Sequence, residues 1–222
     1  MSNYFKKLPD FDYVSRLPNA RISDYIRVKN LFKRTKIRED IFENVAFFER
    51  YTIKGDDRPD IVASKVYGDS TFDWVVLISN NILNIQSEWP LPQREFDSYL
   101  LEKYGDYNTL YNGIHHYETV EIKNLNNITI VPSGLKVDEN YTVSFYDPSL
   151  GVIVTPSVTN VPVTNYEYEE KLNNEKRLIY LLKPFYLNLI VNDLDENMRY
   201  KNGSSQYISE DLKRGDNIRL YD

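Results

Sequence analysis

The spacing of apolar residues predicts that helices and short strands alternate along this chain. Within residues 37–48 the apolar positions recur at helical intervals, and the pattern then changes to the alternation of a short strand at residues 51–53. Gly55-Asp56-Asp57 is typical of a turn, and Pro59 suits the first turn of a helix for which Asp57 is available as a cap. We therefore expect a helix, a strand, a tight turn and a second helix in succession.

Residues 51–90 are expected to form one strand–helix–helix–strand module. Residues 72–78 are apolar on nearly every side, which predicts a helix that is enclosed by other structure. Asn80-Asn81 is expected to end this helix, and residues 85–89 are expected to return as the second strand. All four elements of the module would then come from one continuous stretch of chain.

The whole pattern predicts an α+β fold without internal repeats. The other expected elements are an amphipathic helix at 96–104 that Gly105 ends, β segments at 117–122, 128–131, 141–146 and 152–155, a helix at 166–173, a strand at 177–182 and an amphipathic helix at 184–197. The expected regions are an extended basic and aromatic arm (1–36), a helix leading into the module (37–50), the module (51–90), an amphipathic helix and linker (91–114), an antiparallel β insertion (115–165), a helix–strand–helix region (166–200) and a polar tail (201–222). The arm is expected to need a neighbouring protein to bury its rings, and the tail to be mobile until bound.

The composition favours a folded protein with little material for catalysis. Of its 222 residues, 41% are hydrophobic and 27% charged, which is enough for one or two domains, and no apolar run approaches the roughly 18 residues of a membrane span. Cysteine is absent and only two histidines are present, which excludes thiolate chemistry and leaves little for acid–base catalysis. The first residues lack the apolar stretch of a secretory signal. The 19 tyrosines suit surfaces that become buried on assembly.

Positive charge gathers near the N-terminus, although the net charge of the chain is −6. Residues 1–50 hold 11 Lys or Arg against 7 Asp or Glu, and the densest stretch, residues 21–38, has only Asp24 opposing its cations. Such a stretch predicts a contact with nucleic acid, a contact with an acidic protein, or a solvated arm. No nucleic-acid-binding motif accompanies it, and a sequence pI near 5.1 argues against a dedicated nucleic-acid binder.

No motif predicts a metal, a cofactor or a catalytic site. His115 and His116 are adjacent, so on a regular strand they would point to opposite faces and would not reach one metal ion. The carboxylates of Asp56-Asp57-Asp60 and Asp193-Asp195-Glu196 fit a capped turn and a helix surface and not a calcium loop. The glycines do not cluster as a phosphate loop requires. We therefore expect no cofactor, no metal and no small-molecule substrate.

Residues 51–85 resemble a LysM module. The matching positions are Tyr51, Ile53, Gly55-Asp56, Ile61, Ala63, Tyr67-Gly68-Asp69, Trp74, Ile78 and Asn80. The resemblance implies a strand–helix–helix–strand fold whose core contains Tyr51, Ile53, Ile61, Trp74 and Ile78. Because LysM modules most often bind glycans that contain N-acetylglucosamine, a peptidoglycan- or chitooligosaccharide-binding module is the alternative function. The usual closing segment of that module is replaced here by residues 86–91, and only one copy is present.

A longer set of motifs resembles the small baseplate wedge protein family (gene product fifty-three) of T-even-like, contractile-tailed phages. The motifs are Gly55-Asp56-Asp57-Arg58-Pro59-Asp60, Tyr67-Gly68-Asp69-Ser70, Asp73-Trp74-Val75-Val76-Leu77, Asn80-Asn81-Ile82, Trp89-Pro90-Leu91, Phe96 to Gly105, Asn165 to Glu169 and Leu172 to Pro184. Together they span most of residues 37–200. Residues 118–164 and those after 200 carry no matching motif.

This second resemblance implies a non-enzymatic structural subunit of a phage tail baseplate wedge, located in the virion and assembled in the host cytoplasm. The implied partners are other wedge subunits, namely the wedge-core helical proteins and the sheath-initiating small wedge protein, with about six copies per baseplate, one in each wedge. Asp56, Asp57 and Arg58 form the candidate protein-contact turn, because charges on an exposed turn can pair with a neighbouring wedge. Neither nucleic acid nor a membrane is an expected partner.

Overall fold

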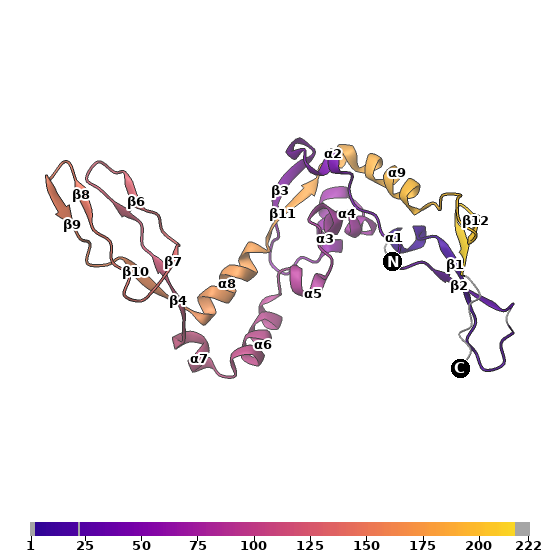
Figure 1. The fold of residues 1–222 in the computed structure, drawn as a ribbon, viewed down its shortest axis with the longest axis horizontal. Coiled ribbons are helices and arrows are strands. Elements are labelled where there is room, and N and C mark those ends of the chain that lie inside the picture. The colour runs from indigo at the N-terminus through magenta and orange to yellow at the C-terminus, as the bar shows by residue number, and fades with distance from the viewer. Residues whose placement is uncertain (1–2, 22, 216–222) are drawn as a thin grey trace. The chain divides into compact units, whose positions relative to one another are not determined.

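The chain enters one structural unit, leaves it for a second and then returns to the first. In a computed structural model that describes residues 3–21 and 23–215, unit 1 consists of residues 1–89 and 178–222, and unit 2 consists of residues 90–177 (Figure 1). Both units mix helices with small sheets, so the fold is α+β, as predicted. Among the described residues, no helix combines the length and apolar character needed to cross a membrane.

Unit 1 is built from short helices and two separate sheets. Its helices are α1 (Asn3–Lys7), α2 (Glu39–Phe42), α3 (Pro59–Tyr67), α4 (Asp73–Ser79), α5 (Ile85–Glu88) and α9 (Leu187–Met198), with 3₁₀ turns η1 (Val45–Phe47), η2 (Ser70–Phe72) and η3 (Pro184–Tyr186). Its strands are β1 (Asp10–Val14), β2 (Tyr25–Lys29), β3 (Phe48–Thr52), β11 (Leu178–Leu182), β12 (Tyr207–Ser209) and β13 (Leu212–Arg214). The strand orders of the two sheets are β12-β13-β1-β2 and β11-β3.

The predicted strand–helix–helix–strand module is not formed by residues 51–90 alone, because the strand that pairs with β3 is β11, from much later in the chain. β3 pairs antiparallel with β11, in register from Phe48 opposite Leu182 to Thr52 opposite Leu178, and α3 and α4 follow β3 (Figure 1). The predicted returning strand at residues 85–89 is wrong, because residues 85–88 form α5. The Asn84 side chain accepts a hydrogen bond from the Gln86 N–H (3.0 Å), and this local cap starts a helical turn.

Two apolar clusters meet on α4 and β11, which explains why both sequences are so apolar. The first cluster contains Leu8, Ile37, Ile41, Phe48, Trp74, Val75, Leu182, Ile190, Leu194 and Met198. The second contains Ile53, Val62, Ala63, Val76, Trp89, Ile179 and Leu181. Because α4 gives Trp74 and Val75 to one cluster and Val76 to the other, it is enclosed, as the sequence predicted.

The long helix predicted within residues 37–50 is wrong. Only α2 is helical there, and η1 and β3 follow it at once. Asn44 has an extended backbone, and its side chain accepts a hydrogen bond from the Ala46 N–H (3.0 Å), which begins a new turn. Ile41 is buried as the helical spacing suggested, whereas Val45 is 74% exposed because the helix has already ended.

The N-terminal arm and the C-terminal tail pair with each other, which corrects two predictions. β1 lies parallel to β13, with Phe11 opposite Lys213, and antiparallel to β2. Leu8 is buried in the first cluster, so this part of the arm packs on its own chain and does not wait for a neighbouring protein. Pairing between distant segments leaves no local signal, since each strand alone is short and irregular. Residues 216–222 of the predicted polar tail lie outside the described residues.

Unit 2 is a helical base that carries a β lobe. Its helices are α6 (Gln93–Tyr104), α7 (Tyr107–Asn112) and α8 (Asn165–Glu175). Its strands are β4 (Ile114–Thr119), β5 (Ile122–Lys123), β6 (Thr129–Val131), β7 (Lys136–Val137), β8 (Phe145–Asp147), β9 (Val152–Val154) and β10 (Asn160–Thr164). They form one three-stranded sheet, β10-β4-β7, and two hairpins, β5-β6 and β8-β9. We call residues 114–164 the β lobe.

The helices of unit 2 largely follow the sequence prediction. α6 ends at Gly105, whose φ of 83° suits a residue without a side chain, and α8 begins with a capping box between Thr164 and Glu167. The buried carboxylate of Glu169 accepts hydrogen bonds from Lys103 Nζ (2.6 Å) and the Tyr104 hydroxyl (3.0 Å), and so joins α8 to α6. The predicted helices at 96–104 and 166–173 are confirmed, whereas α7, β7 and β10 were not predicted.

Candidate functional site

The predicted contact turn is present, but its charged side chains mostly pair with one another. Asp57 Oδ2 lies 2.5 Å from Lys65 Nζ on α3, and Arg58 makes a two-pronged contact with Asp60, with nitrogen–oxygen distances of 3.0 and 2.7 Å. The guanidinium of Arg58 lowers the pKa of the Asp60 carboxyl. Asp56 is exposed, and no ion pair involves it among the described residues. The expected Asp57 cap is absent, because Arg58 occupies the cap position of α3 without a side-chain hydrogen bond.

The structure separates the five predicted core residues into three groups. Ile53 and Trp74 are buried, at 2% and 5% exposure. Tyr51 and Ile78 are half-buried and pack against the edges of the second and first clusters. Ile61 is 39% exposed and belongs to neither cluster. α3 presents Val62 and Ala63 to the core, and successive helical residues point about 100° apart, so Ile61 turns away.

The side chain of Asn80 joins α4 to β11, because its amide group hydrogen-bonds both the N–H and the carbonyl of one residue of β11. Its Nδ2 donates to the Tyr180 carbonyl (2.8 Å), and its Oδ1 accepts from the Tyr180 N–H (2.7 Å). Nδ2 also donates to the carbonyl of Val76 (2.9 Å). The backbone of β11 is therefore hydrogen-bonded on both sides, by β3 and by Asn80.

Replacing Asn80 by alanine is expected to lower the free energy of unfolding by about 1–3 kcal/mol, because the Tyr180 N–H and carbonyl lose their partners. Asn80→Asp keeps the acceptor for the Tyr180 N–H but places a carboxylate oxygen against the carbonyls of Tyr180 and Val76, so it should cost at least as much. Urea denaturation followed by circular dichroism measures both variants. Equal stability of wild type and Asn80→Ala would show that this link contributes nothing.

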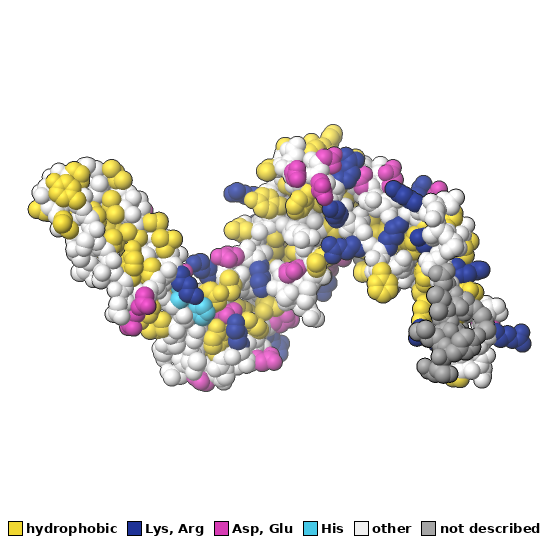
Figure 2. Space-filling view, in the orientation of Figure 1, with side chains coloured by type: hydrophobic (Ala, Val, Ile, Leu, Met, Phe, Trp, Pro, Cys, Tyr) yellow, Lys and Arg dark blue, Asp and Glu magenta, His cyan; other side chains and the backbone are white. Residues whose placement is uncertain are grey.

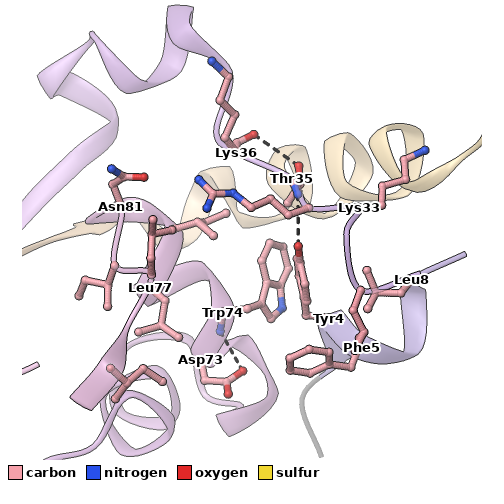
Figure 3. A pocket seen from close by; sticks show the side chains of 16 residues that line it. Tyr4, Phe5, Leu8, Lys33, Thr35, Lys36, Asp73, Trp74, Leu77 and Asn81 are labelled. Atoms are coloured by element: carbon pink, nitrogen blue, oxygen red, sulfur yellow. Dashed lines mark hydrogen bonds between the residues drawn. The ribbon is translucent and has the colours of Figure 1, made fainter. Parts of the chain in front are cut away.

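A mostly apolar hollow of about 480 Å³ lies beside Trp74 (Figure 3). Its apolar lining comes from α1, α4, α5 and the segments beside them: Tyr4, Phe5, Leu8, Leu31, Trp74, Leu77, Ile78, Ile82, Leu83 and Ile85. Tyr4 and Trp74 face each other in Figure 3, with their ring centroids 5.9 Å apart. The Trp74 indole N–H is buried, and no hydrogen-bond partner for it is present among the described residues. We call this hollow the Trp74 hollow.

A second, shallower hollow of about 440 Å³ is lined by basic side chains around Tyr200. Lys33 and Lys213 lie over the Tyr200 ring, at 4.7 and 5.1 Å from its centroid. Lys201 and Arg199 also line this hollow, and Glu196 is its carboxylate. Burial lowers the pKa of Lys33, and the neighbouring charges of Lys213 and Lys201 lower it further. We call this the Tyr200 hollow.

The β lobe exposes an unusual number of large apolar side chains. The exposed ones are Ile114, Leu125, Ile128, Ile130, Leu135, Tyr146, Leu150, Val152, Ile153, Val158 and Val161, whereas Ile122 and Val131 are its buried aliphatic residues. In the face drawn in Figure 2, apolar side chains run along the strands of this lobe. Within residues 140–164 the only charged residue is Asp147, and its side chain is buried.

The two histidines contact each other, which corrects the prediction that they face opposite ways. His116 of β4 pairs with Val163, and Ile114 pairs with Thr164, so His115 is an extra residue in a β-bulge. The two Nδ1 atoms lie 2.8 Å apart. Within residues 3–21 and 23–215, no three His, Asp or Glu side chains are arranged to hold a metal ion.

The sequence of the chain matches one protein-family profile. A family profile described as base plate wedge protein 53 matches residues 4–196, which is most of the chain. No curated protein sequence matches the chain significantly. The profile includes the β lobe, for which the sequence motifs gave no match. The match supports a structural role in a phage baseplate, in contact with other baseplate proteins, and a location in the virion.

Proposed function

Because this chain belongs to the base plate wedge protein 53 family, we propose that it joins neighbouring wedge subunits through protein–protein contacts and catalyses no reaction. The observation that carries this proposal is the apolar surface of the β lobe. Large contiguous apolar surfaces on soluble proteins are typical of interfaces, since each Å² removed from water contributes roughly 25 cal/mol. Because so few of its aliphatic side chains are buried within the lobe itself, docking against a partner protein would remove most of its apolar surface from water.

Unit 1 supports the same role in another way. We propose that β3, α3, α4 and β11 form a LysM-like module that unit 2 interrupts. In this proposal the module is a compact scaffold and not a glycan site. The paired charges of Asp57 and Arg58 keep the turn rigid, and Asp56 is the member of the predicted contact turn that remains available to a neighbouring wedge.

The proposed partners are the wedge-core helical proteins and the sheath-initiating small wedge protein. We propose one copy in each wedge, about six per baseplate, because cyclic symmetry repeats each wedge subunit around the axis. Assembly would take place in the host cytoplasm before the virion is complete.

Introducing aspartate at Tyr146 and Ile153 tests the β lobe. These residues face each other across the β8-β9 hairpin and are 62% and 72% exposed, so the double variant should fold normally. A buried unpaired charge is costly, so the double variant should lose co-purification with co-expressed wedge subunits of the same phage. Val45→Asp, at an equally exposed position of unit 1, is the control that should co-purify normally.

Two results would contradict the proposed function. The first is normal co-purification of the Tyr146→Asp, Ile153→Asp variant, or no co-purification of the wild type with any wedge subunit. The second is saturable binding of chitooligosaccharides by the isolated wild-type chain in calorimetry, which would favour the glycan-binding alternative.

A further inference from the structure

Residues 31–36 form a ridge between the two hollows of unit 1. Leu31 and Thr35 line the Trp74 hollow, Phe32 lines the Tyr200 hollow, and Lys33 lines both. A hydrogen bond from the Thr35 N–H to the Tyr4 hydroxyl (3.2 Å) holds the ridge against α1. Any segment that crosses this ridge therefore contacts an apolar hollow on one side and a basic hollow on the other.

Of the six cations of this ridge and of the Tyr200 hollow, Lys36 pairs with Glu39 and Arg199 with Glu210, whereas the other four have no carboxylate partner in the described part of the chain. Lys33 donates to the carbonyl of Arg199 (2.5 Å), and no ion pair involves Lys33, Arg34, Lys201 or Lys213 among the described residues. Like charges held this close repel one another, which costs free energy that an anionic partner would recover. This excess of positive charge lies in a chain whose net charge is −6.

The Trp74 hollow supplies the apolar half of the surface. Phe5 and Leu83 at its rim are 56% and 64% exposed, although both are large and apolar. The partnerless indole N–H of Trp74 belongs to a residue that lines it. A volume of this size holds one or two apolar side chains, and Lys33, Arg34 and Lys36 line the hollow beside its apolar residues.

We propose that an acidic segment of a partner wedge subunit binds across the ridge, with an apolar side chain in the Trp74 hollow and carboxylates against Arg34, Lys33 and Lys213. This inference rests on the proposed function and adds the chemistry of the partner. The apolar hollow favours a peptide over nucleic acid, because a phosphate backbone would leave it unfilled. The net negative charge of the chain also repels a long polyanion.

Short overlapping peptides that cover the wedge subunits of the same phage are the probe. Binding to the full-length chain is measured by fluorescence anisotropy at low and at high salt. Peptides that bind should combine Asp or Glu with an apolar residue, and their affinity should fall as salt rises. The Arg34→Glu, Lys213→Glu variant should weaken this binding by about tenfold or more. Leu83→Asp should weaken it without changing the basic residues.

The matched control reverses Arg94 and Lys136, which are exposed cations of unit 2 without an ion pair in the described part of the chain. It makes the same change in net charge and should leave peptide binding unchanged. Binding of none of the peptides, or equal binding to the wild type and the Arg34→Glu, Lys213→Glu variant, would overturn the inference. A DNA duplex that binds the wild type in preference to the peptides, and loses affinity in that variant, would overturn it in favour of nucleic acid.

Co-purification separates this inference from the proposed function. If the wild type co-purifies with wedge subunits and no peptide binds at the ridge, only the inference fails. If the wild type co-purifies with none of them, the proposed function fails as well.

Discussion

Replacing Trp74 by alanine is expected to lower the free energy of unfolding by about 3–5 kcal/mol, the usual cost of removing a buried aromatic side chain. Trp74 is 5% exposed and lies in the first apolar cluster, beside Val75, and against the ring of Tyr4. The indole N–H has no partner to lose, so the whole cost comes from packing. Trp74→Phe keeps most of the packing and removes the unpaired donor, and it should therefore cost much less.

Urea denaturation followed by circular dichroism measures these differences. Ile61→Ala is the control, since Ile61 belongs to the same predicted core but is 39% exposed, and it should cost about 1 kcal/mol or less. A Trp74→Ala protein as stable as the wild type would remove Trp74 from the core of unit 1.

A fragment of residues 51–90 is expected to remain unfolded, although it contains the whole of the predicted module. The fragment lacks β11, and with it the partner of β3 and the buried Ile179 and Leu181 of the second cluster. Three short helices without the strand that covers them cannot offset the entropy of ordering their backbone. Thermal denaturation followed by circular dichroism should show no cooperative transition.

The matched comparison joins residues 1–89 to residues 178–215 through a short glycine–serine linker. Trp89 and Ile179 lie in the same cluster, so the linker joins two segments that pack together. This protein retains β11 and should unfold cooperatively. Cooperative unfolding of the 51–90 fragment alone would mean that β11 is dispensable.

The sequence predicted those elements that local signals define. Pro59 and Gly68 mark the two ends of α3, the apolar run predicts the enclosed α4, and the strand at 177–182 was identified. The sequence did not reveal which strand pairs with β3. The partner strand is separated from β3 by the whole of unit 2, and the pattern of apolar residues along the chain does not indicate which distant strands pair. The nearby residues 85–89 offered a plausible alternation, but the Asn84 cap made them helical.

The candidate sites were predictable only in part, for a similar reason. A turn was predicted at Gly55-Asp56-Asp57 and one is present there, but the spacing does not reveal that Arg58 pairs with Asp60 and Asp57 with Lys65. The basic stretch at 21–38 was visible, whereas its position beside Lys201 and Lys213 depends on the pairing of β1 with β13. The low charge of residues 140–164 was a usable signal for the exposed apolar lobe.

Because unit 1 is built from two separate stretches of chain, it cannot complete its folding until the second stretch has been synthesised. β3 leaves the ribosome before all of unit 2, and β11 leaves after it. At about 5–20 residues per second, β3 waits on the order of ten seconds for its partner. Throughout that interval the apolar faces of α3 and α4 lack the cover that Ile179 and Leu181 provide. Unit 2 can fold first, and unit 1 closes only when nearly the whole chain has been made, so a prematurely terminated chain is not expected to compete for places in the wedge.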